Sequence, residues 1–212
     1  MPAAGRPGDL DPTLRSGGVG YQNLASSQSR INDVVLLPDG RFIAAGFRRR
    51  GRNNDPALIR YQSNGTVDTS FGNGGVASVG FGNGSDYAEA VTRQSDGKLV
   101  VAGWSASLSP NRWALARFTA DGIIDPTFGN GGTVMTLLQS GGCEAYAVVQ
   151  QADGKLVAAG RASNGGSYYL ALVRYNADGS LDTTFGSGGI VVQPLGASAV
   201  PYTRSRNCPT AS

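Results

Sequence analysis

The chain has 212 residues, of which 40% are hydrophobic and 32 are glycine, and its formal net charge is +3 at pH 7. So many glycines favour short strands joined by tight turns over long helices. The sequence has no histidine, which argues against zinc sites and Ser-His-Asp catalysis. The interspersed charges do not indicate specific nucleic acid binding, and no stretch approaches the ~20 apolar residues of a membrane span.

An eight-residue motif recurs every 57 residues. It reads DTSFGNGG from Asp68, DPTFGNGG from Asp125 and DTTFGSGG from Asp182, and a divergent copy, DPTLRSGG, begins at Asp11. A fixed period of this length is typical of repeat architectures. The period divides the chain into a leader (1–7), a degenerate first unit (8–64), two full units (65–121 and 122–178), a partial fourth unit (179–195) and an off-pattern tail (196–212).

Each unit begins with two predicted strands. The first follows the Gly-Gly pair, over residues 19–24, 76–79, 133–138 and 190–193. The second ends at an Asp-Gly turn and covers residues 31–37, 88–94 and 145–151. Asp-Gly between apolar runs is a strong hairpin signal, so we expect the next strand to be antiparallel.

Two further strands complete the unit. The third is a continuous apolar run, typical of a strand buried on both faces, over residues 41–45, 98–102 and 155–159. We expect it to stop at Gly46, Gly103 and Gly160. After a variable loop, the fourth covers residues 57–61, 114–118 and 171–175.

Four antiparallel strands per unit are the plan of a propeller blade. The predicted fold is all-β: a β-propeller-type array of four-stranded antiparallel blades, about three blades plus the single strand 190–193. Closure typically takes 4–8 blades, so we expect an open or incomplete propeller. Either the chain is part of a longer array, or two copies associate, with each single strand completing the partner's sheet.

The patterns GxxDxxFGxGG, DGKLVxAG and ALxRYxxDG together resemble the delta-60 repeat, a bacterial tandem repeat regarded as a β-propeller unit. The resemblance covers roughly residues 8–189. The first unit departs from it, with Leu14-Arg15 in place of Phe-Gly and Arg41 in place of Lys. The resemblance implies tandem arrays, often in large surface or secreted proteins, with no established activity, and it supplies no catalytic residue.

An arginine stands eight residues before the motif aspartate in three units. We predict an ion pair that braces each blade, because repeated polar pairs usually fix register. Two alternatives are a solvated acid that caps its own turn, and half of a calcium site built with Asp121 or Asp178 and backbone carbonyls. The pairs are Arg60 with Asp68, Arg117 with Asp125, and Arg174 with Asp182.

The motif phenylalanines, Phe71, Phe128 and Phe185, are predicted to pack one blade on the next. The alternative is an aromatic platform for a sugar or a base. Leu14 takes this place in the divergent copy, and leucine can fill a gap but cannot stack on a sugar.

The variable loops, residues 47–55, 104–113 and 161–169, are the predicted ligand-contacting regions. The first contains the only dense basic run, which would bind phosphate or an acidic glycan, or simply be a solvated hairpin tip. Lys98 and Lys155 recur with the repeat, which argues against a catalytic lysine. The candidate contact residues are Arg48, Arg49, Arg50, Arg52, Trp104, Trp113, Tyr168 and Tyr169.

Taken together, the sequence favours a non-catalytic module that serves as a binding or structural scaffold, without a cofactor. Its partner would be a protein, a glycan, or a second copy through open blade edges. The alternative is a calcium-dependent, lactonase-like propeller hydrolase. The strand-adjacent acids available to it, which do not recur in step, are Asp33, Asp86, Glu89 and Glu144. Cys143 and Cys208 lie outside the repeat pattern and do not indicate a redox compartment.

Overall fold

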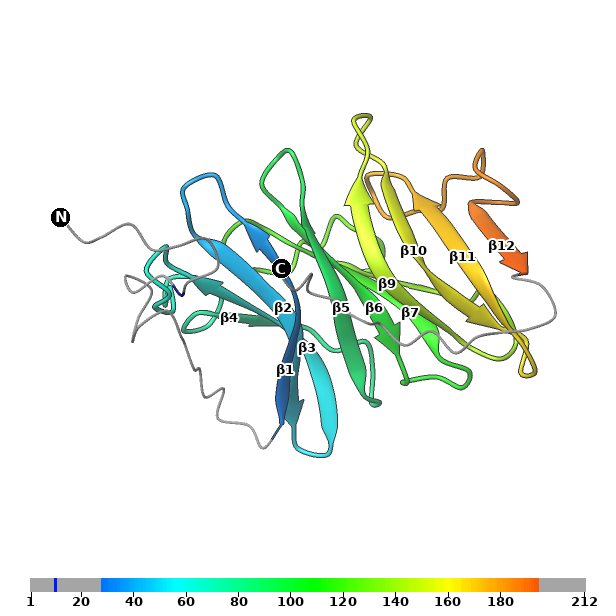
Figure 1. The fold of residues 1–212 in the computed structure, drawn as a ribbon, viewed down its shortest axis with the longest axis horizontal. Coiled ribbons are helices and arrows are strands. Elements are labelled where there is room, and N and C mark those ends of the chain that lie inside the picture. Colours follow the sequence, from blue (N-terminus) through cyan, green and yellow to red (C-terminus); the bar gives the residue numbers. More distant parts are fainter. Residues whose placement is uncertain (1–9, 11–27, 195–212) are drawn as a thin grey trace, which may run out of the picture.

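The computed structural model describes Leu10 and residues 28–194. This part of the chain is all-β, as predicted, and forms three four-stranded antiparallel sheets (Figure 1). It contains no helix, and therefore no helix that could cross a membrane.

We call the sheets blades 1 to 3. Blade 1 contains β1 (Ser29–Leu36), β2 (Phe42–Arg50), β3 (Asn53–Tyr61) and β4 (Val76–Ser78). Blade 2 contains β5 (Asp86–Arg93), β6 (Leu99–Ser105), β7 (Arg112–Phe118) and β8 (Thr133–Thr136). Blade 3 contains β9 (Cys143–Gln150), β10 (Leu156–Ser163), β11 (Tyr168–Tyr175) and β12 (Ile190–Pro194).

The blades are offset from the sequence units. In each sheet the strand after the Gly-Gly pair is the last one, hydrogen-bonded to the strand that precedes the motif. β12 therefore pairs with β11 and completes blade 3, so the expectation of a single strand left over to complete a partner's sheet is wrong. After β11 ends at Tyr175, the chain passes through the motif and returns at Ile190 to pair with β11 itself. The strand predicted over residues 19–24 lies outside the described residues.

The third predicted strand does not stop at its glycine. β2, β6 and β10 run on to Arg50, Ser105 and Ser163, because this glycine serves close approach and not termination. A Cβ on Gly46 would lie 1.8 Å from the carbonyl oxygen of Arg30 on β1. The neighbouring strand carries a bulge at this level in all three blades, and a bulge brings its backbone toward the glycine.

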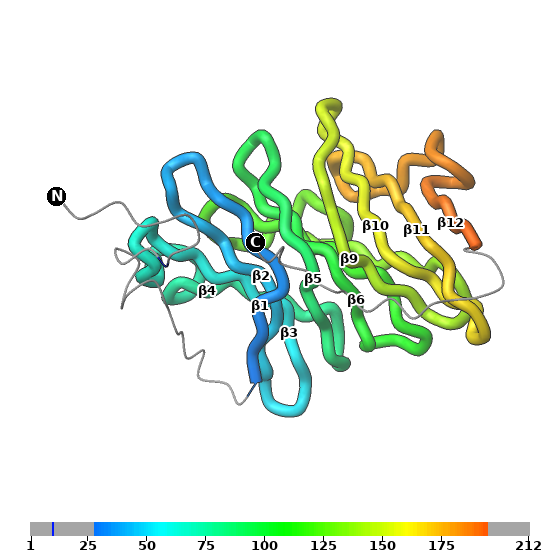
Figure 2. The backbone as a smooth tube through the Cα atoms, in the orientation of Figure 1, coloured from blue at the N-terminus to red at the C-terminus, as the bar shows by residue number. Residues whose placement is uncertain are grey.

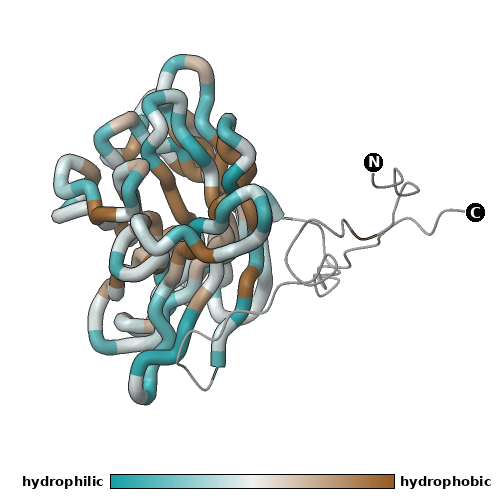
Figure 3. Tube along the Cα trace, turned by 90° about the vertical axis from the view of Figure 1, so that its left-hand side faces the viewer, coloured by the Kyte–Doolittle hydropathy of each residue, from teal (hydrophilic) through white to brown (hydrophobic). Residues whose placement is uncertain are grey.

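The blades pack face to face. Alternate residues of β6 face opposite ways: Leu99 and Val101 join a core cluster with blade 1, whereas Val100 and Ala102 join one with blade 3. This explains the continuous apolar run, since blade 2 is covered on both faces. Figure 3, which looks onto the blade 1 end, shows hydrophobic and hydrophilic residues interspersed along the trace.

The row of blades has two distinct edges. The Asp-Gly turns between the first and second strands of each blade lie along the upper edge in Figures 1 and 2. The hairpin tips that join β2 to β3, β6 to β7 and β10 to β11 lie along the lower edge. The repeated turns and the variable tips are thus separated by the length of the strands.

Candidate functional site: the repeated brace and the hairpin edge

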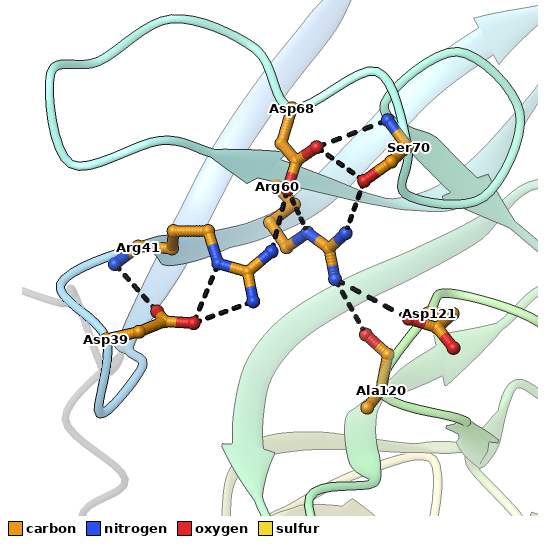
Figure 4. A network of polar contacts seen from close by, with 7 residues as sticks. All are labelled: Asp39, Arg41, Arg60, Asp68, Ser70, Ala120 and Asp121. Carbon is orange, nitrogen blue, oxygen red and sulfur yellow. Dashed lines mark hydrogen bonds and ion pairs between the residues drawn. The ribbon is translucent and has the colours of Figure 1, made fainter.

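Each motif aspartate is held by the arginine eight residues before it. Arg60 Nε lies 2.7 Å from Asp68 Oδ2, Arg117 Nε lies 2.8 Å from Asp125 Oδ2, and Arg174 Nε lies 2.7 Å from Asp182 Oδ2. The other carboxylate oxygen accepts a hydroxyl from Ser70, Thr127 or Thr184 two residues on. Figure 4 shows this arrangement around Asp68.

A second cation also contacts each motif aspartate, which the sequence analysis did not predict. We call the motif aspartate, its arginine, this second cation and the hydroxyl donor together the brace. Arg41 Nη1 lies 2.9 Å from Asp68 Oδ2, Lys98 Nζ lies 3.1 Å from Asp125 Oδ2, and Lys155 Nζ lies 3.0 Å from Asp182 Oδ2. The signal was in the sequence: this basic residue always precedes the motif aspartate by 27 positions. The two lysines and Arg41 therefore have the same structural partner.

These contacts lower the pKa of all three carboxyl groups. Hydrogen bonds from the Ser70 side chain and from Arg41 lower the pKa of Asp68 well below its usual range. Burial by itself would raise the pKa of Asp125, but bonds from Thr127 and Lys98 and the charge of Arg117 outweigh it. The Thr184 hydroxyl and Lys155 lower the pKa of Asp182. Each aspartate is thus ionised at neutral pH, and its oxygens are occupied by protein donors.

The brace also reaches the next blade. Arg60 Nη1 donates to the carbonyl oxygen of Ala120 at 3.0 Å, and Arg117 Nη1 donates likewise to that of Ala177. The amides of Gly72 and Gly129 donate to the carbonyl oxygens of Asp121 and Asp178, each at 2.7 Å. An arginine from one blade is therefore bonded to a turn of the following blade.

The motif phenylalanine packs at the same junction. Phe71 and Phe128 have no exposed surface, and the guanidinium carbons of Arg60 and Arg117 lie 4.9 and 4.6 Å from the ring centroids. A Cβ on Gly122 of the next blade would lie 2.7 Å from the Phe71 ring. Phe185, which no described blade follows, is half-buried. Neither Phe71 nor Phe128 offers a face to a sugar or a base.

The basic run lies on a hairpin and not in a long loop. Arg48, Arg49 and Arg50 belong to β2, and only Gly51 and Arg52 separate it from β3. The Arg50 side chain is 79% exposed, and its guanidinium lies 3.7 Å from Asp55 on β3. Burial raises the pKa of Asp55. Arg50 and Arg52 thus present positive charge at the tip of the lower edge.

The aromatic candidates differ in exposure. Trp104 and Trp113 are cross-strand partners on β6 and β7, not loop residues. Trp113 is fully buried and its Nε1 donates to the carbonyl oxygen of Arg161 on blade 3 at 3.2 Å. Trp104 is half-buried and stacks on Tyr87, with 4.2 Å between centroids. Tyr168 is 51% exposed, with the Arg161 guanidinium 4.5 Å from its ring, and the Tyr169 hydroxyl accepts from Asn164.

The strand-adjacent acids do not gather at one point. Asp33 accepts from the amide of Val91, Asp86 accepts from the amide of Phe81 and the Ser107 hydroxyl, and Glu144 accepts from Tyr146 and Arg161. Within residues 10 and 28–194 no three acidic or cysteine side chains lie close enough to hold one metal ion. Cys143 is buried, and burial raises the pKa of its thiol.

Three four-stranded antiparallel sheets packed face to face, each joined to the next through the same arginine and phenylalanine, define a β-propeller-like repeat protein. Residues 37–71, 94–128 and 151–185 match the model of a family described as a domain of unknown function (DUF5122) β-propeller. Each matched segment starts at the Asp-Gly turn, ends on the motif phenylalanine and contains the complete brace. No curated protein matches the chain.

Proposed function

We propose that this chain is a non-catalytic scaffold of delta-60-type repeats that binds a protein or glycan through the lower edge of its blades. One observation supports this most: the charged groups that recur in every blade are occupied in joining strands and blades. The hairpin tips differ in sequence between blades, and loops on a rigid repeated scaffold commonly carry specificity.

Hydrogen bonds link the hairpin tips of the lower edge to the neighbouring blades. The side-chain amide of Asn53 donates to the carbonyl oxygen of Asn83 at 2.6 Å, which links the β2–β3 tip to the segment before β5. The amide of Cys143 donates to the carbonyl oxygen of Asn111 at 3.1 Å, which links the β6–β7 tip to blade 3. A ligand could therefore contact tips of adjacent blades without their moving apart.

The arginines favour an acidic partner at the blade 1 end. Arg50 and Arg52 are exposed, and a sulfated or carboxylated glycan, or an acidic protein segment, would bring the opposite charge. Tyr168 at the other end adds an exposed aromatic face of the kind that packs on sugar rings.

The test is binding to an array of sulfated and neutral glycans and acidic peptides. The double variant Arg50→Ser with Arg52→Ser, and a variant with all three tips replaced by Gly-Ser, should lose binding to acidic probes, and added salt should weaken it in the wild type. Arg93→Ser is the control, because Arg93 lies beside the Asp-Gly turn at the opposite edge. If the variant with all three tips replaced by Gly-Ser bound every ligand as the wild type does, the proposal would be contradicted. A calcium-dependent rise in melting temperature would favour the hydrolase alternative instead.

A further inference from the structure

The outward face of blade 3 carries side chains whose counterparts are buried inside the row. Leu172 on β11 is 39% exposed and Leu170 is 52% exposed. The residues 57 positions earlier, Leu115 and Trp113, have no exposed surface, because they lie between blades 2 and 3. Blade 3, the last of the described blades, therefore exposes the same kind of face that blades 1 and 2 use for packing.

Blade 1 shows the complementary face at the other end. Val34 on β1 is 59% exposed, whereas its counterparts Val91 and Val148 are each 6% exposed and pack on the preceding blade. Ile31 is 55% exposed, and its counterpart Ala88 is 1% exposed. The row therefore exposes one apolar face of each kind, and the two kinds pack together at both internal junctions.

Blade 3 also has two polar donors, on Arg174 and Gly186, whose counterparts in blades 1 and 2 are bonded to the next blade. Arg174 uses Nε for Asp182 and Nη2 for Thr184, but in the part of the chain that the structure describes its Nη1 contacts no acceptor. The corresponding atoms of Arg60 and Arg117 are bonded to the next blade. Over the same described residues, the amide of Gly186 likewise contacts no acceptor, unlike those of Gly72 and Gly129. The Arg174 side chain is 21% exposed, against 5% and 6% for its counterparts.

Blade 1 holds the matching acceptors. Ser63 and Asn64 take the places of Ala120 and Asp121, and among the described residues no donor contacts their carbonyl oxygens. Gly65 has φ 79°, against 80° for Gly122, which accommodates the Phe71 ring. This turn of blade 1 has the acceptors and the conformation that Arg174, Gly186 and Phe185 would meet.

We infer that the outward face of blade 3 binds blade 1 of a second copy of this chain, in the arrangement that already joins the blades within it. Two copies joined at both ends would form a two-fold ring of twice three blades, within the usual range of 4–8. Because β12 fills its own sheet, the contact is face to face and exchanges no strand. The inference rests on the proposed scaffold function but uses surfaces separate from the hairpin tips.

The first experiment is sedimentation velocity on the full chain between about 1 and 100 µM, where interfaces of ordinary size associate. We expect a dimer. Leu172→Lys and Val34→Lys should each weaken association by roughly tenfold or more, because each alters one of the two faces. Met135→Lys is the control: Met135 is 40% exposed on β8 but lies on neither end face, so it should leave the dimer intact. The melting of dilute Leu172→Lys should match that of dilute wild type, which shows that the monomer still folds.

Mixing the two lysine variants distinguishes a contact between blade 3 and blade 1 from any other kind of dimer. Leu172→Lys keeps a normal blade 1 and Val34→Lys keeps a normal blade 3, so mixing the two should restore association through one intact contact. A monomeric wild type over the whole range, a dimer that resists both lysine variants, or a mixture that stays monomeric would overturn the inference. A species that keeps growing would overturn the closed ring. Monomeric Leu172→Lys should still bind the glycan and peptide probes, so failure of association and failure of the proposed function are read separately.

Discussion

At the scale of single residues, each motif aspartate concentrates three interactions on one carboxylate. Asp125 accepts from Arg117, Lys98 and Thr127 and is 5% exposed. A carboxylate in this position is satisfied only while its donors are held in place, because breaking a buried pair leaves an uncompensated charge. The brace therefore depends on ionisation of the aspartate as well as on its geometry.

The lowered pKa of these carboxyl groups predicts the pH dependence of stability. The unfolded aspartates take up protons near pH 3.9, and the folded ones only at lower pH. This stabilisation is therefore complete above about pH 5 and is lost as the pH falls below about 4. Asp125→Asn should lower the free energy of unfolding by about 3 kcal/mol at pH 7. As the pH falls, the free energy of unfolding of this variant should decrease less than that of the wild type. Denaturant titration from pH 7 to pH 2.5 would measure both effects.

Asp96→Asn provides the matched control for that measurement. Asp96 lies 3.6 Å from the same Lys98, but its side chain is 53% exposed. An exposed pair contributes about 0–1 kcal/mol, so its removal should barely change either the stability or the acid dependence. Equal effects of the two substitutions would contradict the bracing role of Asp125.

At the scale of elements, the motif loop fits against one glycine of the next blade. Gly122 has φ 80°, and a Cβ there would lie 2.7 Å from the buried Phe71 ring. Gly122→Val should lower the stability by about 2–4 kcal/mol, since it adds both backbone strain and a clash, as thermal and denaturant unfolding would measure. Gly154→Ala is the control that measures the backbone strain alone. Gly154 has φ 84°, and a Cβ added there would have nothing within 4 Å. If both variants lost the same stability, the clash with Phe71 would have no part in it.

The sequence predicted the elements better than their assembly. Apolar runs and Asp-Gly turns identified the strands, because these signals are local. The sequence did not predict the hydrogen bond from Arg60 to Ala120. This bond joins residues 60 positions apart, and its acceptor is a backbone carbonyl, which any residue provides. The role of Gly46 is not predictable for a related reason: a glycine that ends a strand and one that admits a neighbouring backbone look alike in one sequence. The position of Trp113 on β7 is not predictable either, because the sequence of the variable tip does not show where β7 begins.

At the scale of the whole molecule, blade 2 is the only described blade with a neighbour on each face. Stability in such a row is expected to be highest where both faces are covered. Hydrogen exchange should therefore be slowest in β6 and β7 and faster in β1 and β12, as mass spectrometry of the dilute chain would show. The same comparison at high concentration should slow exchange at the two ends if they associate. Slowest exchange in β1 or β12 of the dilute chain would contradict this order.

The offset between blades and sequence units has a consequence for how such genes change length. Every sheet takes three strands from one unit and its last strand from the next, so any two successive units supply one complete sheet. An unequal crossover that removes or adds 57 codons, wherever it falls within the repeat, rejoins equivalent positions and leaves every sheet with four strands. Arrays of this kind can thus grow or shrink by whole blades in one recombination event, without passing through an intermediate in which a sheet lacks a strand.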